Sequence, residues 1–205
     1  MTENILNKEP YISFYQDVFT PEECDFVIDA SEKLNLYERS TIYSTKLKRS
    51  VLADWRTSSS FEDIDGCFDE IKKKCYDVLK NKFLYIPNFS VDHFEKTQIQ
   101  RYCVGEFVGS HLDCFNGYGN NITDNDKIAT MIIYLNDNFE GGETHFDDLE
   151  IKSNPKKGSG LFFCYDYGSQ LNQKTKHQGL PVTEGTKYII TCWIRKKPIT
   201  NWVKK

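Results

Sequence analysis

The chain has 205 residues, of which 39% are apolar and 14% aromatic, and its 26 basic and 30 acidic side chains leave a formal net charge of −4. This length suits a single domain, and the large aromatic side chains can build a core despite the modest apolar fraction. The acidic balance argues against general nucleic-acid binding, which favours a strong basic excess, and no apolar run reaches the roughly 18–20 residues that span a bilayer.

The first nineteen residues lack a basic segment followed by an apolar run, so we expect no signal peptide and a cytoplasmic protein. The chain has seven cysteines, an odd number, and no pair shows the CxxC spacing of tight metal-ligand pairs. We therefore expect free thiols, most of them buried, and neither a disulfide framework nor a cysteine zinc site.

Two helices are predicted in the N-terminal part of the chain. The first begins after Thr20, because a hydroxyl cap, a proline at the first helical position and Glu23 three residues after the cap form a capping box. A second helix is predicted to begin near Ser60, with one apolar face over residues 68–79. The polar, basic stretch between them, residues 39–56, is expected to form strands or a long loop.

From about residue 90 the sequence changes to short alternating or apolar runs separated by turn residues. The runs predict strands over residues 97–104, 129–135, 160–165 and 188–194. Many short strands without long helices between them are typical of a barrel or a double-sheet jelly roll. We expect a mainly β fold with the two N-terminal helices packed outside it.

The four histidines include two that begin a His-x-Asp triplet, at His111 to Asp113 and at His145 to Asp147. Residues two apart on a strand point to the same face, so each triplet offers an imidazole and a carboxylate side by side. One more histidine from another strand would complete the two-histidine, one-carboxylate arrangement that suits non-haem Fe(II). A His-x-Asp triplet is a weak signal by itself, and the two triplets are rivals.

The surroundings of the first triplet resemble the metal-binding strand of the prolyl 4-hydroxylases, a group of 2-oxoglutarate- and Fe(II)-dependent dioxygenases. The segment from Tyr102 to Asp113 shows a tyrosine, a glycine three residues later, an aromatic residue and then His-x-Asp. Residues 128–136, 140–144, 155–163 and 177–193 follow in the order of further family motifs. Arg56-Thr57-Ser58 resembles the family's Arg-Thr-Ser segment near the peptide groove.

The resemblance implies a double-stranded β-helix, or jelly-roll, barrel in one domain. Its expected parts are an N-terminal support region of helices and strands over residues 1–90, a catalytic core over residues 91–197 and a tail over residues 198–205. Lys127 and Tyr188 depart from the residues usual in the family, and residues 116–126 form a polar insert. These departures affect the expected substrate more than the metal centre.

The resemblance also assigns roles to individual residues. His111, Asp113 and His177 would be the catalytic metal ligands, and Lys187, ten positions after His177, would bind 2-oxoglutarate. The remaining positions are Tyr102 and Thr144 for the cosubstrate, and Trp193, Arg56 and Ser58 for the substrate. Counting by twos puts Lys187 and Trp193 on one face of the last strand, where both can face the cavity. In this reading His145 and Asp147 are surface or supporting residues.

The implied function is hydroxylation of a peptidyl proline, coupled to decarboxylation of 2-oxoglutarate to succinate. Fe(II), 2-oxoglutarate and O2 would take part, with ascorbate as reductant and a protein or peptide substrate that contains proline. No membrane partner is expected, and the acidic balance argues against nucleic acid. Two alternatives stay open: the same chemistry on a lysyl or other residue or on a small molecule, and a non-catalytic jelly-roll binding module.

Overall fold

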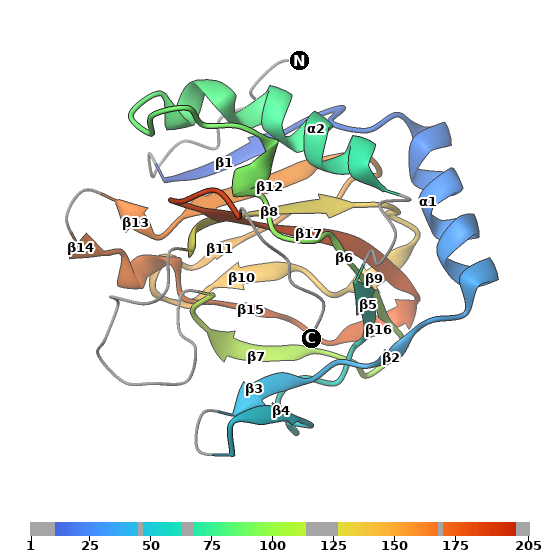
Figure 1. The fold of residues 1–205 in the computed structure, drawn as a ribbon. Coiled ribbons are helices and arrows are strands. Elements are labelled where there is room, and N and C mark those ends of the chain that lie inside the picture. Colours follow the sequence, from blue (N-terminus) through green and yellow to red (C-terminus); the bar gives the residue numbers. More distant parts are fainter. Residues whose placement is uncertain (1–10, 45–46, 63–67, 114–126, 168–169, 200–205) are drawn as a thin grey trace.

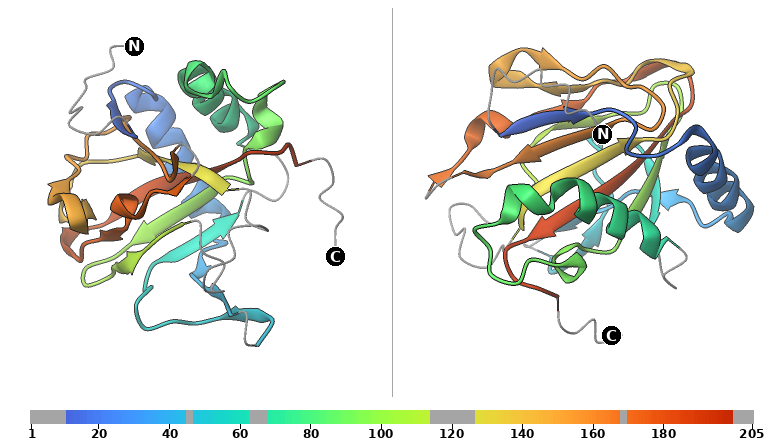
Figure 2. Two further views of the ribbon diagram at one scale, coloured as in Figure 1. Left: turned by 90° about the vertical axis from the view of Figure 1, so that its left-hand side faces the viewer. Right: turned by 90° about the horizontal axis from the view of Figure 1, so that it is seen from above.

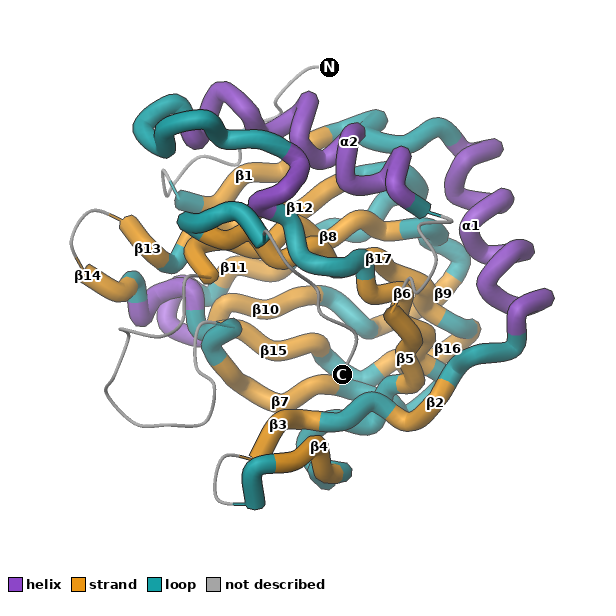
Figure 3. The backbone as a smooth tube through the Cα atoms, viewed as in Figure 1, coloured by secondary structure: helices purple, strands orange, loops and turns teal. Residues whose placement is uncertain are grey.

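The computed structural model describes residues 11–44, 47–62, 68–113, 127–167 and 170–199. The polar insert at 116–126 lies outside these described residues. The fold consists of two facing antiparallel sheets with two helices on one side, and strands make up most of the body (Figures 1 and 3). The mainly β, jelly-roll class expected from the sequence is confirmed.

The larger sheet has seven strands in the order β1-β12-β8-β17-β6-β5-β2. Their bounds are Ile12–Tyr15 (β1), Gly160–Cys164 (β12), Lys127–Tyr134 (β8), Lys187–Arg195 (β17), Gln98–Tyr102 (β6), Ser59–Glu62 (β5) and Glu38–Arg39 (β2). The N-terminal strands β1, β2 and β5 extend this sheet at its two ends, so the N-terminal region contributes strands to the barrel as well as helices outside it.

The smaller sheet has four strands in the order β11-β10-β15-β7. Their bounds are Ile151–Lys152 (β11), Thr144–Phe146 (β10), His177–Gly179 (β15) and Val108–His111 (β7). Three two-stranded pairs complete the set: β3 (Ile42–Ser44) with β4 (Arg49–Val51), β9 (Phe139–Gly141) with β16 (Val182–Gly185), and β13 (Asp166–Tyr167) with β14 (Gln170–Leu171). Segment 39–56 therefore contains strands, one of the two forms expected, and β3 and β4 lie below β7 in Figure 1.

Helix α1 (Pro21–Leu34) begins where the capping box predicts. The Thr20 hydroxyl accepts from the Glu23 amide at 3.3 Å, and the Glu23 carboxylate accepts from the Thr20 amide at 2.9 Å. Together these bonds satisfy two amide hydrogens that the first turn of a helix would otherwise leave unpaired.

Helix α2 (Asp69–Leu79) begins later than the sequence predicts, so the expected start near Ser60 is wrong. Ser59–Glu62 instead forms β5, which pairs with β6. This pairing is between segments far apart in the sequence, and the local helical pattern does not reveal it. Short 3-10 helices cover Lys80–Phe83 (η1), Val91–His93 (η2), Asp147–Leu149 (η4) and Gln173–Thr175 (η5).

Both helices pack on the outer face of the larger sheet (Figure 2). Glu32 of α1 accepts from Arg101 of β6 and from Tyr188 of β17, both at 3.0 Å. The Cys75 thiol of α2 lies 3.9 Å from the Cys192 thiol of β17. Because helices cover one face and the second sheet covers the other, the inner strand β8 is almost continuously buried.

The core between the sheets is rich in aromatic rings, as the composition suggested. Phe146 of β10 and Phe163 of β12 are fully buried, with ring centroids 5.4 Å apart. The described cysteines are free, and all but one are buried: Cys24, Cys75, Cys164 and Cys192, with Cys103 exposed. Cys67 and Cys114 lie outside the described residues. None of the helices described here is both long enough and apolar enough to cross a membrane.

Candidate metal centre and adjoining pockets

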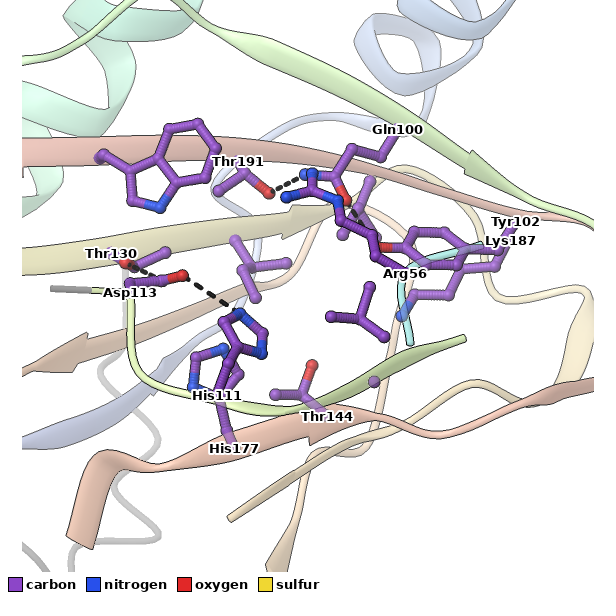
Figure 4. Close-up of a pocket in the computed structure, with 15 residues that line it drawn as sticks. Arg56, Gln100, Tyr102, His111, Asp113, Thr130, Thr144, His177, Lys187 and Thr191 are labelled. Carbon is purple, nitrogen blue, oxygen red and sulfur yellow. Dashed lines mark hydrogen bonds and ion pairs between the residues drawn. The ribbon is translucent and has the colours of Figure 1, made fainter. Parts of the chain in front are cut away.

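Two strands of the smaller sheet bring His111 and His177 together. The two residues are directly opposite in the β7–β15 pairing, and their ring centroids lie 4.5 Å apart. Both rings face the larger sheet (Figure 4). The centre of the His177 ring lies 4.6 Å from that of Phe163 in β12 of this sheet. A cross-strand pair of histidines on the inner face thus forms the floor of the site.

Asp113 completes a compact group just beyond the end of β7. One carboxylate oxygen lies 3.3 Å from His111 Nε2, and the other accepts a 2.5 Å hydrogen bond from the Thr130 hydroxyl of β8. One ligand atom from each of His111, Asp113 and His177 lies within 4.8 Å of the other two. Among the described residues, these are the ones whose His, Cys, Asp or Glu side chains cluster closely enough to hold a metal ion.

The histidine rings are oriented by backbone carbonyls. His111 Nδ1 lies 2.9 Å from the Gly109 carbonyl, and His177 Nδ1 lies 3.0 Å from the Thr175 carbonyl. Because a carbonyl only accepts, each Nδ1 carries a hydrogen, so Nε2 is the ring atom that each histidine can offer to a metal. This is the tautomer that an Nε2 metal ligand requires.

Burial sets the charge states of the same groups. It lowers the pKa of His177 to about 4, so this imidazole is neutral near pH 7. Burial alone would raise the pKa of Asp113, but a hydrogen bond from His111 and the charge of His177, which is protonated at the acidic pH where Asp113 titrates, hold that pKa well below its usual range. The centre therefore offers two nitrogen donors and one ionised carboxylate, a donor set that suits non-haem Fe(II).

Lys187 lies at the start of β17, directly opposite Tyr102 of β6, and its ammonium sits 4.8 Å from the centre of the Tyr102 ring. The side chain is 2% exposed and donates a 2.6 Å hydrogen bond to the Gly142 carbonyl. Burial lowers the pKa of Lys187 to about 8, and interaction with Glu143 opposes that shift. A cation held inside the barrel can bind a carboxylate in a place from which bulk water is excluded.

A chain of hydrogen bonds runs from this lysine pocket along β6 (Figure 4). The Tyr102 hydroxyl donates to Gln100 Oε1 at 2.5 Å, and Gln100 Nε2 donates to the Thr191 hydroxyl and to Gln98 Oε1, both at 2.9 Å. Arg56 donates to the same Gln98 oxygen at 2.9 Å. The chain links the buried pocket to a more open groove.

Two adjoining cavities meet at the centre. An inner cavity of about 50 Å³ and an outer groove of about 550 Å³ share Arg56, His111, Asp113 and Trp193 in their walls. The inner cavity also borders Tyr102, Thr144, Gln100, Thr191 and Lys187, and the groove also borders Trp55, Glu62, Glu95, Gln98 and Lys127. This arrangement can hold a small acid inside and a longer chain outside, with both reaching the same group of ligands.

Trp193 borders both cavities, and its indole Nε1–H is buried without a hydrogen-bond partner among the described residues. The Lys127 ammonium lies 4.2 Å from the centre of the Trp193 ring and 3.4 Å from Glu95. Arg195 approaches the other oxygen of Glu95 at 2.7 Å. The ion pairs hold Lys127 against one face of the indole, and the unpaired N–H can donate to an acceptor that enters the site.

Of the three other residues that the sequence predicts at the site, Arg56 and Thr144 border a cavity and Ser58 does not. Arg56 borders both cavities, and Thr144 borders the inner cavity while its hydroxyl lies 2.9 Å from the Tyr134 hydroxyl. The Ser58 hydroxyl is instead buried 2.9 Å from the Ser40 hydroxyl, and Ser58 is absent from the described walls of both cavities.

The histidine and aspartate of the rival triplet, His145 and Asp147, lie on the outer face of the smaller sheet. His145 is paired with Gln178, whereas the next residue, Phe146, is paired with His177 and points into the core. His145 Nδ1 lies 3.5 Å from the Asp147 carboxylate, and neither residue belongs to the group around His177.

Sequence reasoning missed several lining residues, among them Gln98, Gln100, Glu95 and Thr130. Gln98 and Gln100 have a local signal, because counting back by twos from Tyr102 places both on its face of β6. Glu95 and Thr130 lie on separate segments that come together only in the folded barrel.

Comparison with known proteins agrees with this geometry. Residues 97–195 match the 2OG-Fe(II) oxygenase superfamily. The chain is 29% identical to a probable prolyl 4-hydroxylase 10 of Arabidopsis thaliana over 93% of this chain and 71% of that protein. It is 31% identical to a putative prolyl 4-hydroxylase of Acanthamoeba polyphaga mimivirus, over 54% of this chain and 48% of that protein.

Solved structures give the same picture. A viral collagen prolyl hydroxylase of Paramecium Bursaria Chlorella virus-1, in complex with 2OG, superposes with a TM-score of 0.71 at 29% identity, covering 93% of this chain and 98% of that one. A prolyl 4-hydroxylase of Pseudomonas putida shares the fold with a TM-score of 0.64 at 15% identity, covering 91% and 93% of the two chains.

Proposed function

Because residues 97–195 match the 2OG-Fe(II) oxygenase superfamily, we propose that the chain hydroxylates a peptidyl proline and converts 2-oxoglutarate to succinate. The observation that carries the proposal is the group of His111, Asp113 and His177, which borders the same cavity as the buried Lys187. The plant and viral relatives named as prolyl hydroxylases support proline as the target.

The metal ligands in this proposal are His111 Nε2, His177 Nε2 and the Asp113 carboxylate. The Nδ1–carbonyl contacts leave Nε2 as the ligand atom of each histidine, and the neutral His177 can bind a divalent ion without first losing a proton. When bound, Fe(II) with 2-oxoglutarate supplies the O2 chemistry that inserts one oxygen atom into a C–H bond.

The cosubstrate occupies the inner cavity. Lys187 pairs with the carboxylate of 2-oxoglutarate that lies farther from the metal, and the Tyr102 and Thr144 hydroxyls border the same cavity. The Tyr102 hydroxyl donates to Gln100 in this structure and would turn its hydrogen to the carboxylate when the cosubstrate binds. Burial of this pocket keeps water from competing for the ammonium and holds the cosubstrate in one orientation. Each turnover consumes O2 and 2-oxoglutarate, and it releases CO2, succinate and the hydroxylated product.

The peptide occupies the outer groove. Arg56 and Trp193 border both the groove and the inner cavity, so they can bind the segment that brings a proline to the metal. The free indole N–H of Trp193 is a donor for a peptide carbonyl. Ser58 is fully buried and borders neither cavity, so we assign it no direct contact with the peptide.

The test is oxygen-dependent succinate release with Fe(II), 2-oxoglutarate and ascorbate, stimulated by proline-rich peptides. We expect a mass gain of one oxygen atom that fragmentation assigns to proline. Matched peptides with alanine in place of proline should give no product, and a His111→Ala variant should give no turnover. If the added oxygen is found on a lysine, or on a small molecule instead of any peptide, that group replaces proline as the target. If no substrate is turned over, the proposal that the protein is an enzyme is wrong.

A further inference from the structure

Asp147 holds together the two strands that carry the histidines, and it does so from the outer face of the smaller sheet. Its two carboxylate oxygens accept hydrogen bonds from different strands: one from the Ser110 hydroxyl of β7, the other from Gln178 Nε2 of β15 at 2.8 Å. Ser110 directly precedes His111, and Gln178 directly follows His177. Each bond therefore ends on the sequence neighbour of a histidine.

The backbone pairing is irregular at this place. His177 is opposite His111, but Gly179 is opposite Val108, so the register shifts between the two pairs. One residue of β15 then faces two of β7, which is the geometry of a bulge and interrupts the ladder of backbone hydrogen bonds. β7 is also the last strand of its sheet, and on its other side the described residues give it only a single bridge, between Val108 and Arg56, in place of a neighbouring strand. Backbone pairing alone thus holds the two histidine-bearing strands together less firmly than a regular ladder would.

The surroundings of Asp147 fix its position. Its backbone amide donates to the Lys176 carbonyl at 3.3 Å, next to His177 in the chain. His145 Nδ1 lies 3.5 Å from one carboxylate oxygen of Asp147 and 3.4 Å from Gln178 Nε2. The second His-x-Asp triplet is therefore part of the same outer network.

We propose that Asp147 is a positioning residue, which sets the distance between His111 and His177 by joining Ser110 to Gln178 across the bulge. The inference rests on the proposed function, because it assumes that these two histidines bind the metal. Hydrogen-bonded residues around metal ligands commonly change metal affinity about 10- to 100-fold when they are removed. Asp147 acts through the strands rather than through contact with the histidine rings.

The test compares three variants by titrating metal-free protein with Co(II), following heat of binding and the ligand-field absorption of the ion. Asp147→Ala removes both hydrogen bonds, and we expect about tenfold weaker binding and an altered absorption spectrum. Asp147→Asn should bind almost as tightly as wild type, because an amide can still accept from Gln178 and can donate to the Ser110 hydroxyl. Asp148→Ala, at an exposed residue of the same short helix, is the control and should change nothing.

Thermal unfolding of the metal-free proteins shows whether each variant is folded. Should Asp147→Ala fail to fold, Ser110→Ala and Gln178→Ala each remove one hydrogen bond, and each should lose part of the affinity. The proposal is overturned if folded Asp147→Ala, or both single-bond variants, bind Co(II) as wild type does. It is also overturned if Asp147→Asn loses as much as Asp147→Ala, because charge would then be the cause.

A His111→Ala variant separates this inference from the proposed function. If wild type binds Co(II) and His111→Ala does not, the metal site stands, and the Asp147 variants decide the positioning role alone. If wild type and His111→Ala bind alike, the metal site itself is wrong.

Discussion

Burial lowers the pKa of both His177 and Lys187, yet the two residues keep different charge states near pH 7, and each state suits the role proposed for its residue. The pKa of His177 falls to about 4, which leaves a neutral nitrogen donor near pH 7. The pKa of Lys187 falls only to about 8, so the ammonium is still mostly charged near pH 7. Desolvation acts against the charge of both residues, and Lys187 keeps its charge because the ordinary pKa of a lysine is much higher than that of a histidine.

The choice between the two triplets can be tested by metal content. Alanine at His111 or at Asp113 should reduce iron binding by more than about 100-fold, because even supporting residues of metal sites cost about 10- to 100-fold. Alanine at His145 should leave bound iron, since this side chain faces away from His177. The measurement is the iron content of each variant after anaerobic purification. Loss of iron in the His145 variant, with retention in the His111 variant, would show that the second triplet binds the metal.

The low pKa of Lys187 predicts a pH limit on cosubstrate capture. Below about pH 8 the free enzyme carries the ammonium that pairs with 2-oxoglutarate, and above it that charge is lost. The ratio kcat/KM for 2-oxoglutarate reports the free enzyme, so it should fall as pH rises through about 8. A Lys187→Arg variant stays charged over this range, so it should lack the alkaline fall even if its activity is lower. An unchanged fall in this variant would assign the titration to another group.

At the scale of elements, the turn between β9 and β10 brings the backbone to Lys187. Gly141 and Gly142 adopt positive φ angles of 70° and 67°, which side chains rarely tolerate. A Cβ atom on Gly142 would lie 3.1 Å from Lys187 Cδ, and the Gly142 carbonyl accepts from the Lys187 ammonium. The sequence Gly141-Gly142 therefore serves close contact with the lysine as well as the turn.

A Gly142→Ala variant should raise the KM for 2-oxoglutarate about tenfold, which corresponds to about 1.4 kcal/mol of binding free energy. Its left-handed backbone should also lower the free energy of unfolding by about 1–2 kcal/mol. Gly105→Ala is the matched control, because Gly105 has φ of 84° but no atom within 4 Å of an added Cβ. The Gly105→Ala variant should lose stability in urea unfolding without a change in KM. Equal KM changes in both variants would contradict a specific contact between Gly142 and Lys187.

At the scale of the whole molecule, the site is assembled from both sheets. His111 and His177 come from the smaller sheet, whereas Lys187 and Tyr102 come from the larger one. Asp113 is joined to the larger sheet by the Thr130 hydroxyl. A bound metal with 2-oxoglutarate would thus connect the two layers of the barrel, and its binding should stabilise the folded state as a whole.

Metal and cosubstrate together should therefore raise the melting temperature. Ligand at about 100 times its Kd raises the free energy of unfolding by about 2.7 kcal/mol, which for a chain of this size raises the melting temperature by about 5–10 °C. Thermal unfolding with and without Co(II) and 2-oxoglutarate measures the shift, and a chelator should abolish it. The His111→Ala protein should show no shift, and an equal shift in that variant would mean binding outside the proposed site.

Much of the fold and of the site follows from local sequence signals. The capping box fixes the start of α1, and alternation along residues 187–195 places Lys187 and Trp193 on the inner face of the last strand. The helix start near Ser60 is wrong because β5 is defined by its pairing with β6, a contact between distant segments. The buried Ser58 and the missed Glu95 likewise depend on which segments meet in the barrel.

The sequence by itself determined the chemistry: two histidines, an aspartate and a lysine in an order and spacing that resemble the family. Only the tertiary structure decided which triplet meets His177. β15 lies between β7 and β10, so His111 and His145 both have access to its strand. The register of β7 and β15 places His111 opposite His177, whereas the register of β10 and β15 places Phe146, rather than His145, opposite His177. A shift of one residue moves a side chain to the other face of a sheet. Because register is set by pairing across the whole sheet and by packing of the core, no local pattern could supply it.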